Sequence, residues 1–101
     1  MFFFVTMSHP DGPGWGEHVI EHVGYLNGLI EQGKLRASGP AVGTALRTGM
    51  LLFTVTDRAE LDTLIAGDPF AREGLIEELT VMQWDPMFGA FAPESSRGTA
   101  A

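Results

Sequence analysis

Residues 50–56 read Met-Leu-Leu-Phe-Thr-Val-Thr and form the clearest predicted strand of the chain, because β-branched and aromatic residues favour pleated structure. Residues 1–7, Met-Phe-Phe-Phe-Val-Thr-Met, have the same character. Both stretches carry apolar side chains at odd and even positions alike, which is typical of strands covered on both faces. They therefore predict a sheet that is buried on both sides.

Two helices are predicted, one after the strand at residues 1–7 and one after the strand at residues 50–56. The first runs from about Trp15 to Gln32 and ends at Gly33, which suits a left-handed helix cap. Its apolar face is predicted from residues at helical spacing, namely Val19, Val23, Leu26 and Ile30. The second helix begins at Asp57, with Glu60 placed three residues later as in a capping box, and ends at Gly67.

Shorter strands are predicted at residues 34–38 and at about residues 75–84. The order β-α-β-β-α-β predicts a ferredoxin-like α+β fold, an antiparallel sheet with both helices on one face. Two helices leave the other apolar face bare, so a second copy packed sheet to sheet is expected, giving a homodimer. The domain is predicted to cover residues 1–91, with a small and polar tail at residues 92–101 that is predicted to be disordered.

The composition excludes several classes of function. The chain has 101 residues, enough for one domain, and its hydrophobic fraction of 45% is high for that size, as a hidden interface would require. A net charge of −7 disfavours nucleic acid and anionic membrane surfaces. The absence of cysteine excludes disulfides, thiolate catalysis and cysteine metal sites. No stretch has membrane-spanning length, and the start lacks the basic region of a secretion signal, so a cytoplasmic location is expected.

Several short motifs occur in a recognisable order. His22-Val23-Gly24-Tyr25-Leu26 is followed by Gly33-Lys34-Leu35 and by Ser38-Gly39-Pro40, and a second motif, Asp68-Pro69-Phe70, precedes Gly74-Leu75. This order and spacing resemble the pattern of the YciI-like (YCII-related) domain family over about residues 1–90.

The resemblance implies a ferredoxin-like domain that dimerises through its sheets into an α/β barrel. It also implies a pocket with a paired histidine and aspartate, here His22 and Asp68. Candidate substrate-binding residues in that pocket are Tyr25, Ser38, Gly39, Pro40 and Phe70. One branch of the family resembles a cofactor-free dehydrochlorinase acting on a chlorinated hydroxyquinol, with this pair as the proposed acid/base. Family members often carry an arginine three residues before the histidine, where this chain has Val19.

His22 also stands out without the resemblance. It falls on the apolar arc of its predicted helix, between Leu26 and Leu29, where an imidazole requires a polar partner or a cavity. An ionised Asp68 would hold one ring nitrogen and leave the other as a proton acceptor near neutral pH. Two alternatives remain open: a core histidine bonded to the backbone, and an aspartate that only caps the turn begun by Pro69.

No metal and no other cofactor are expected. His18 and His22 lie four residues apart on one helix, and His9 offers a third imidazole. However, no glutamate follows His18 as an HExxH motif requires. Ser38 lacks the G-x-S-x-G surroundings of a nucleophilic serine.

Three functions fit these observations. The first is a cofactor-independent lyase or isomerase that transfers protons on a small cyclic or phenolic metabolite, with His22 as general acid or base and Asp68 orienting it. The alternative is a non-catalytic small-molecule-binding or accessory domain, and a third is a purely structural dimer module. A pocket with His22 and Asp68 in hydrogen-bond reach would favour the first function, and a filled core around His22 would favour the third.

Overall fold

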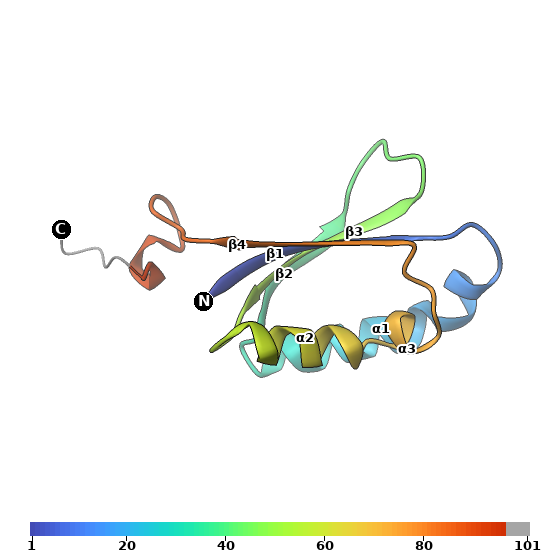
Figure 1. Ribbon diagram of the computed structural model, residues 1–101, viewed down its shortest axis with the longest axis horizontal. Coiled ribbons are helices and arrows are strands. Elements are labelled where there is room, and N and C mark those ends of the chain that lie inside the picture. Colours follow the sequence, from blue (N-terminus) through green and yellow to red (C-terminus); the bar gives the residue numbers. More distant parts are fainter. Residues whose placement is uncertain (97–101) are drawn as a thin grey trace.

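The computed structural model describes residues 1–96, which form an antiparallel sheet with its helices on one side (Figure 1). The strands pair in the order β2-β3-β1-β4. Along the chain the elements are β1 (Phe2–His9), α1 (Gly14–Glu31), β2 (Leu35–Pro40), β3 (Arg47–Thr54), α2 (Arg58–Ala66), α3 (Pro69–Arg72), β4 (Glu78–Trp84) and the short 3-10 helix η1 (Ala92–Glu94). This is the ferredoxin-like α+β fold that the element order predicts.

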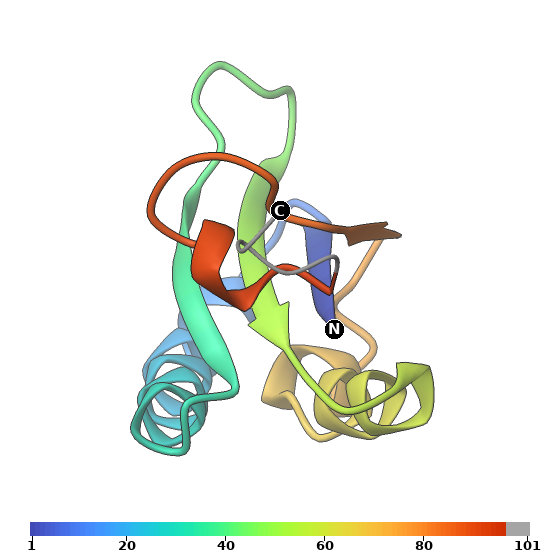
Figure 2. The ribbon, with the colours of Figure 1, turned by 90° about the vertical axis from the view of Figure 1, so that its left-hand side faces the viewer.

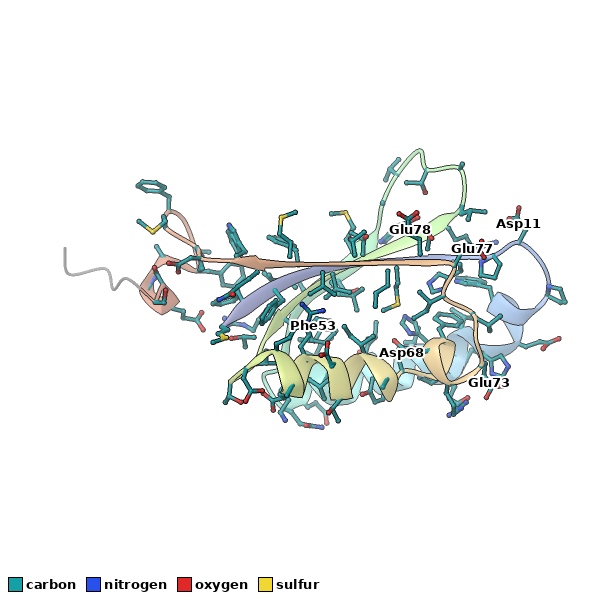
Figure 3. All side chains as sticks on the ribbon, viewed as in Figure 1. Asp11, Phe53, Asp68, Glu73, Glu77 and Glu78 are labelled. Carbon is teal, nitrogen blue, oxygen red and sulfur yellow. The ribbon has the colours of Figure 1, made fainter. Side chains whose placement is uncertain are left out.

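The core lies between the sheet and the helices. Figure 2 shows α1, α2 and α3 on the same side of the sheet. Alternate residues of β1 face the helices, and their neighbours on β3 do the same because paired residues share a face. The cluster comprises Phe3, Val5, Met7, Leu29, Leu35, Leu51, Phe53, Val55, Leu61 and Ile65. Figure 3 shows Phe53 between the two layers.

The buried face of α1 differs from the predicted one. Val23 and Ile30 are about half exposed, whereas Tyr25, Leu26 and Leu29 pack against the core. These three residues follow His22 at spacings of three, four and seven, so they share its side of the helix. The helix is therefore rotated toward the arc that contains His22. No helix within residues 1–96 is both long and apolar enough to cross a membrane.

The face of the sheet away from the helices is apolar and partly uncovered. Phe4 on β1 lies opposite Leu52 on one side and Met82 on the other, so these residues share that face. Phe4, Met50 and Met82 are exposed by 36%, 45% and 70%. The prediction that the strands are apolar on both faces is thus confirmed, and the helices cover only one of them.

One end of this face is covered by the C-terminal segment. The ring of Phe91 lies 5.7 Å from that of Phe2, and Phe2 is buried. Beyond it lies η1, and both Ser95 and Ser96 after it bond the carboxylate of Asp85. The disorder expected for residues 92–101 stays a prediction, and residues 97–101 lie outside the described residues.

Candidate active site

A cleft of about 660 Å³ lies where β1 ends and α1 begins. Its walls come from the end of β1, the first half of α1, Phe70 of α3, and the connection from β2 to β3. That connection rises from the sheet on the side away from the helices (Figures 1 and 2). A cleft of this volume is within the range of small-molecule sites.

His22 and Asp68 form a direct pair beside this cleft. The Nδ1 atom of His22 lies 2.9 Å from each carboxylate oxygen of Asp68, so Nδ1–H donates to the carboxylate. The side chain of His22 is 14% exposed and lines the cleft, while that of Asp68 is 3% exposed and lies behind it. Within residues 1–96 no fully buried side-chain nitrogen or oxygen lacks a hydrogen-bond partner. Because Nε2 of His22 has no such partner there, it is accessible from the cleft.

Asp68 is placed by the local sequence. It follows Gly67 at the end of α2 and precedes Pro69, so it caps α3, and its Oδ1 accepts the Phe70 N–H at 2.9 Å. Figure 3 shows Asp68 at this junction, on the helical side of the sheet. The cap and the histidine contact are alternative roles for Asp68 in the sequence, yet one carboxylate makes both contacts.

His9 is a site residue that the sequence reasoning did not assign. It is the last residue of β1 and is only 5% exposed, and its Nδ1 lies 2.7 Å from the carbonyl oxygen of Leu75. The rings of His9 and His22 each lie 4.4 Å from the ring of Phe70. The strand was predicted to end at residue 7. Extending the alternation of Phe3, Val5 and Met7 by one step would have placed His9 on the same face.

Arg47 and Trp15 form a second feature of the cleft wall. The guanidinium carbon of Arg47 lies 4.0 Å from the centre of the Trp15 ring, a cation–π contact. The Trp15 ring in turn stacks on Phe70 at 6.5 Å, with 18° between the planes. Val19, on α1, lines the same cleft and carries no charge. Arg47, on β3, therefore gives the cleft wall a positive charge.

Four of the five predicted binding residues line the cleft, namely Ser38, Gly39, Pro40 and Phe70. Tyr25 does not. Its hydroxyl donates to the carbonyl oxygen of Leu64 at 2.7 Å, and burial, followed by the nearby Asp68 charge, raises the pKa of the phenol. Tyr25 therefore points toward α2, where its hydrogen bond joins α1 to α2, and it does not line the cleft.

The three histidines do not converge on one point. His18 lies 3.8 Å from a carboxylate oxygen of Glu21 and 3.8 Å from one of Glu73. Within residues 1–96 no group of three or more histidine, aspartate or glutamate side chains is arranged to hold a metal ion.

Comparison with known proteins gives a family and a fold. The sequence profile of the YCII-related domain matches residues 1–85. No curated protein sequence is significantly similar to the chain. The 5-chloro-2-hydroxyhydroquinone dehydrochlorinase TftG from Burkholderia phenoliruptrix AC1100, solved in complex with 2,5-dihydroxybenzoquinone, superposes with a TM-score of 0.72 at 22% identity, over 83% of this chain and 93% of that one.

A second solved structure is more distant. A dimeric ferredoxin-like protein of unknown function from Jannaschia sp. CCS1 gives a TM-score of 0.48 at 20% identity, over 83% of this chain and 97% of that one. At 22% identity the likeness to TftG shows the fold of the chain and leaves the chemistry to the geometry of the cleft.

Proposed function

This chain belongs to the YCII-related domain family, and from that premise we propose that it is a cofactor-independent lyase or isomerase acting on a small cyclic or phenolic metabolite. His22 is the general acid or base, and Asp68 orients it. The observation that supports this function best is the 2.9 Å contact between the two side chains beside a cleft of about 660 Å³.

The pair has the chemistry of a general base. By accepting a hydrogen bond from Nδ1–H, Asp68 holds the imidazole in the tautomer whose Nε2 lone pair points away from the carboxylate. When Nε2 takes a proton from a substrate, the same carboxylate stabilises the imidazolium that forms. Elimination of HCl from a ring needs only such transfers, because one proton and one chloride leave together and no oxidant or reductant takes part.

The cleft wall suits a planar ring that gains negative charge. Trp15 and Phe70 contribute aromatic side chains to its lining, and Arg47 places a cation over the ring of Trp15. The quinone in the TftG complex is a ring of this kind. It is therefore the first ligand to test, and 5-chloro-2-hydroxyhydroquinone is the first substrate.

The variant His22→Asn tests this function. The asparagine amide can still donate to Asp68 near the former Nδ1, but nothing replaces Nε2. We expect chloride release from 5-chloro-2-hydroxyhydroquinone to fall by about 10²- to 10⁴-fold, the usual contribution of a general base. Binding of 2,5-dihydroxybenzoquinone, measured by the quenching of tryptophan fluorescence, should persist.

The same assay separates the alternative function, a binding or accessory domain without chemistry. That domain would bind the quinone through Arg47 and Trp15, and the wild type would release no chloride. Full activity in His22→Asn would remove the acid–base assignment altogether. A His18→Asn variant is the matched control, since His18 faces Glu21 and Glu73 and does not line the cleft.

We also propose that the protein is a homodimer in which a second copy covers the open face of the sheet. Phe4, Met50 and Met82 would be buried by that contact, which fits the high apolar fraction of the chain. Closure of the two sheets into an α/β barrel, which the family resemblance implies, and a cytoplasmic location, which is expected from the sequence, belong to this proposal.

A further inference from the structure

We infer that His9 is a second acid–base residue of the cleft, and that with His22 it moves a proton between a ring carbon and a ring oxygen of a cyclic ketone or hydroxyquinone. The reaction rests on the proposed function of the cleft. Which nitrogen of the His9 ring carries the proton, and which is accessible, does not depend on that function.

The hydrogen bond of His9 determines which ring nitrogen is free. The partner of Nδ1, at 2.7 Å, is the carbonyl oxygen of Leu75, and a carbonyl oxygen only accepts. Nδ1 therefore carries the proton, and in the neutral ring Nε2 keeps its lone pair. His9 lines the cleft, and Nε2 has no partner within residues 1–96, where no fully buried side-chain nitrogen lacks one. This nitrogen is accessible from the cleft, as it is in His22.

The acceptor is held in place by the local backbone. Gly74 has a φ of +70°, which glycine adopts without strain, and it turns the chain after α3. The Leu75 N–H then donates to the carbonyl oxygen of Phe70 at 2.8 Å. Two residues later the Glu77 N–H donates to the carbonyl oxygen of Ser8 at 2.8 Å, next to His9. The Leu75 carbonyl is thus fixed from both sides, and the orientation of the His9 ring is fixed with it.

The two imidazoles are close enough to act on one ring. Each lies 4.4 Å from Phe70, so their centres are separated by no more than twice that distance. Their partners differ in charge, because Asp68 can stabilise an imidazolium at His22, whereas His9 bonds only a neutral carbonyl. Two titratable groups with unequal surroundings are the usual basis for a division into acid and base.

The transfers balance without a co-reactant. Nε2 of neutral His9 takes a proton from a ring carbon beside a carbonyl, so a C–H bond breaks and an N–H bond forms. The electron pair shifts onto the carbonyl oxygen, which takes the Nε2 proton of protonated His22. The product is the enol, and water in the open cleft restores both histidines. In reverse, the same transfers exchange ring hydrogen for deuterium.

The state of the His9 ring is tested first, with no substrate. Ring ¹⁵N shifts of the labelled protein, assigned with His9→Asn and His18→Asn, should show neutral His9 protonated at Nδ1 and bare at Nε2. Diethyl pyrocarbonate should then modify His9, detected by peptide mass spectrometry. A proton on Nε2, or an unmodified His9 beside a modified His18, would overturn the inference.

The chemistry is tested with 2,5-dihydroxybenzoquinone in D₂O. The wild type should accelerate exchange of its ring hydrogens, and His9→Asn should reduce that rate at least about 100-fold. Asparagine keeps a donor for the Leu75 carbonyl, so the melting temperature of His9→Asn should stay near that of the wild type. It has no counterpart of Nε2, which is why the exchange rate should fall. A wild type that binds the quinone without exchanging it, or a His9→Asn that exchanges it normally, contradicts the inference. Loss of chloride release alone counts against the proposed lyase function instead.

Discussion

Asp68 performs two tasks with one carboxylate, and substitutions can separate them. In Asp68→Asn the amide oxygen can still accept the Phe70 N–H, so α3 keeps its cap. The amide nitrogen would replace Oδ2 as a donor facing Nδ1–H, so His22 keeps only the uncharged amide oxygen as an acceptor and loses the carboxylate that stabilises its imidazolium. We expect Asp68→Asn to unfold near the wild-type denaturant midpoint while losing most activity. Asp68→Ala should also lose stability, by about 1–2 kcal/mol for the missing cap, in the same unfolding experiment.

A stable but inactive Asp68→Asn would assign the charge to orienting His22. Equal destabilisation in both variants would instead mean that the carboxylate serves chiefly to hold α3. Glu73→Gln is a suitable control, because Glu73 is an exposed carboxylate just after α3 that does not line the cleft.

Arg47 should govern affinity and leave stability unchanged. It is exposed, and its guanidinium lies over Trp15 at the cleft wall, so it can face an oxyanion of a bound ring. A charged hydrogen bond contributes about 1.5–3 kcal/mol, and therefore Arg47→Ala should raise the Kd for 2,5-dihydroxybenzoquinone at least about tenfold. Arg47→Lys should restore only part of this affinity, since a lysine cannot stack as a plane.

The measurement is a titration of tryptophan fluorescence with the quinone, alongside a melting curve. Arg58→Ala is the matched control, because Arg58 is an exposed arginine paired with Asp62 on α2. If Arg47→Ala binds as well as the wild type, the cleft recognises its ligand without using this charge.

The residues of the site were only partly predictable. His22 was found because an imidazole on an apolar helix face needs a partner, and Asp68 was found through the family motif. No spacing rule connects residues 46 positions apart, so their contact required the fold. His9 and Arg47 were missed because each lies at a strand end that the sequence placed two or three residues away from the observed one.

At the scale of elements, the N-terminus of α2 contains a pH-sensitive contact. Glu60 accepts from Lys34 Nζ at 2.8 Å and from the Thr56 N–H at 2.9 Å, and these bonds, Lys34 first, lower the pKa of its carboxyl from 4.5. The folded state therefore favours the ionised carboxylate. This contribution to stability is fully present above pH 4.5 and is lost as the pH falls through the lowered pKa.

We therefore expect Glu60→Gln to lower the free energy of unfolding at pH 7 and to approach the wild type as the medium becomes acidic. Urea unfolding at a series of pH values measures this difference. Glu77→Gln, an exposed substitution before β4, should show no such convergence. A Glu60→Gln penalty that stays constant with pH would assign the effect to packing, not to charge.

The elements themselves were well predicted, but their orientation was not. Asp57 and Gly67 bound α2 as expected, because caps act locally. The reciprocal bond of the predicted capping box reaches Thr56, one residue before the cap. The rotation of α1 depends on which apolar residues find partners on the sheet, and Val23 and Ile30 were as apolar as those that did. Periodicity alone does not decide between such neighbouring arcs.

At the scale of the whole molecule, the two faces of the sheet make different demands on their residues. Phe53 is 2% exposed within the core under the helices, whereas Met82 is 70% exposed on the open face. Phe53→Asp would bury an unpaired charge and create a cavity, each costing several kcal/mol, against a total stability of about 5–15 kcal/mol for a domain of this kind. We expect this variant to unfold, as shown by loss of the cooperative melting transition.

Met82→Glu should instead dissociate the protein into folded subunits. A glutamate there remains solvated in the monomer, but in a sheet-to-sheet dimer it would be buried beside apolar residues such as Phe4 and Met50. Light scattering coupled to size-exclusion chromatography should therefore give twice the chain mass for the wild type and one chain mass for Met82→Glu. The circular dichroism spectra of the two proteins should be similar. Ile20→Glu, at an even more exposed apolar position on α1, should leave the dimer intact. A wild type that is monomeric at micromolar concentration, or a Met82→Glu that stays dimeric, would mean that another surface or none joins the subunits.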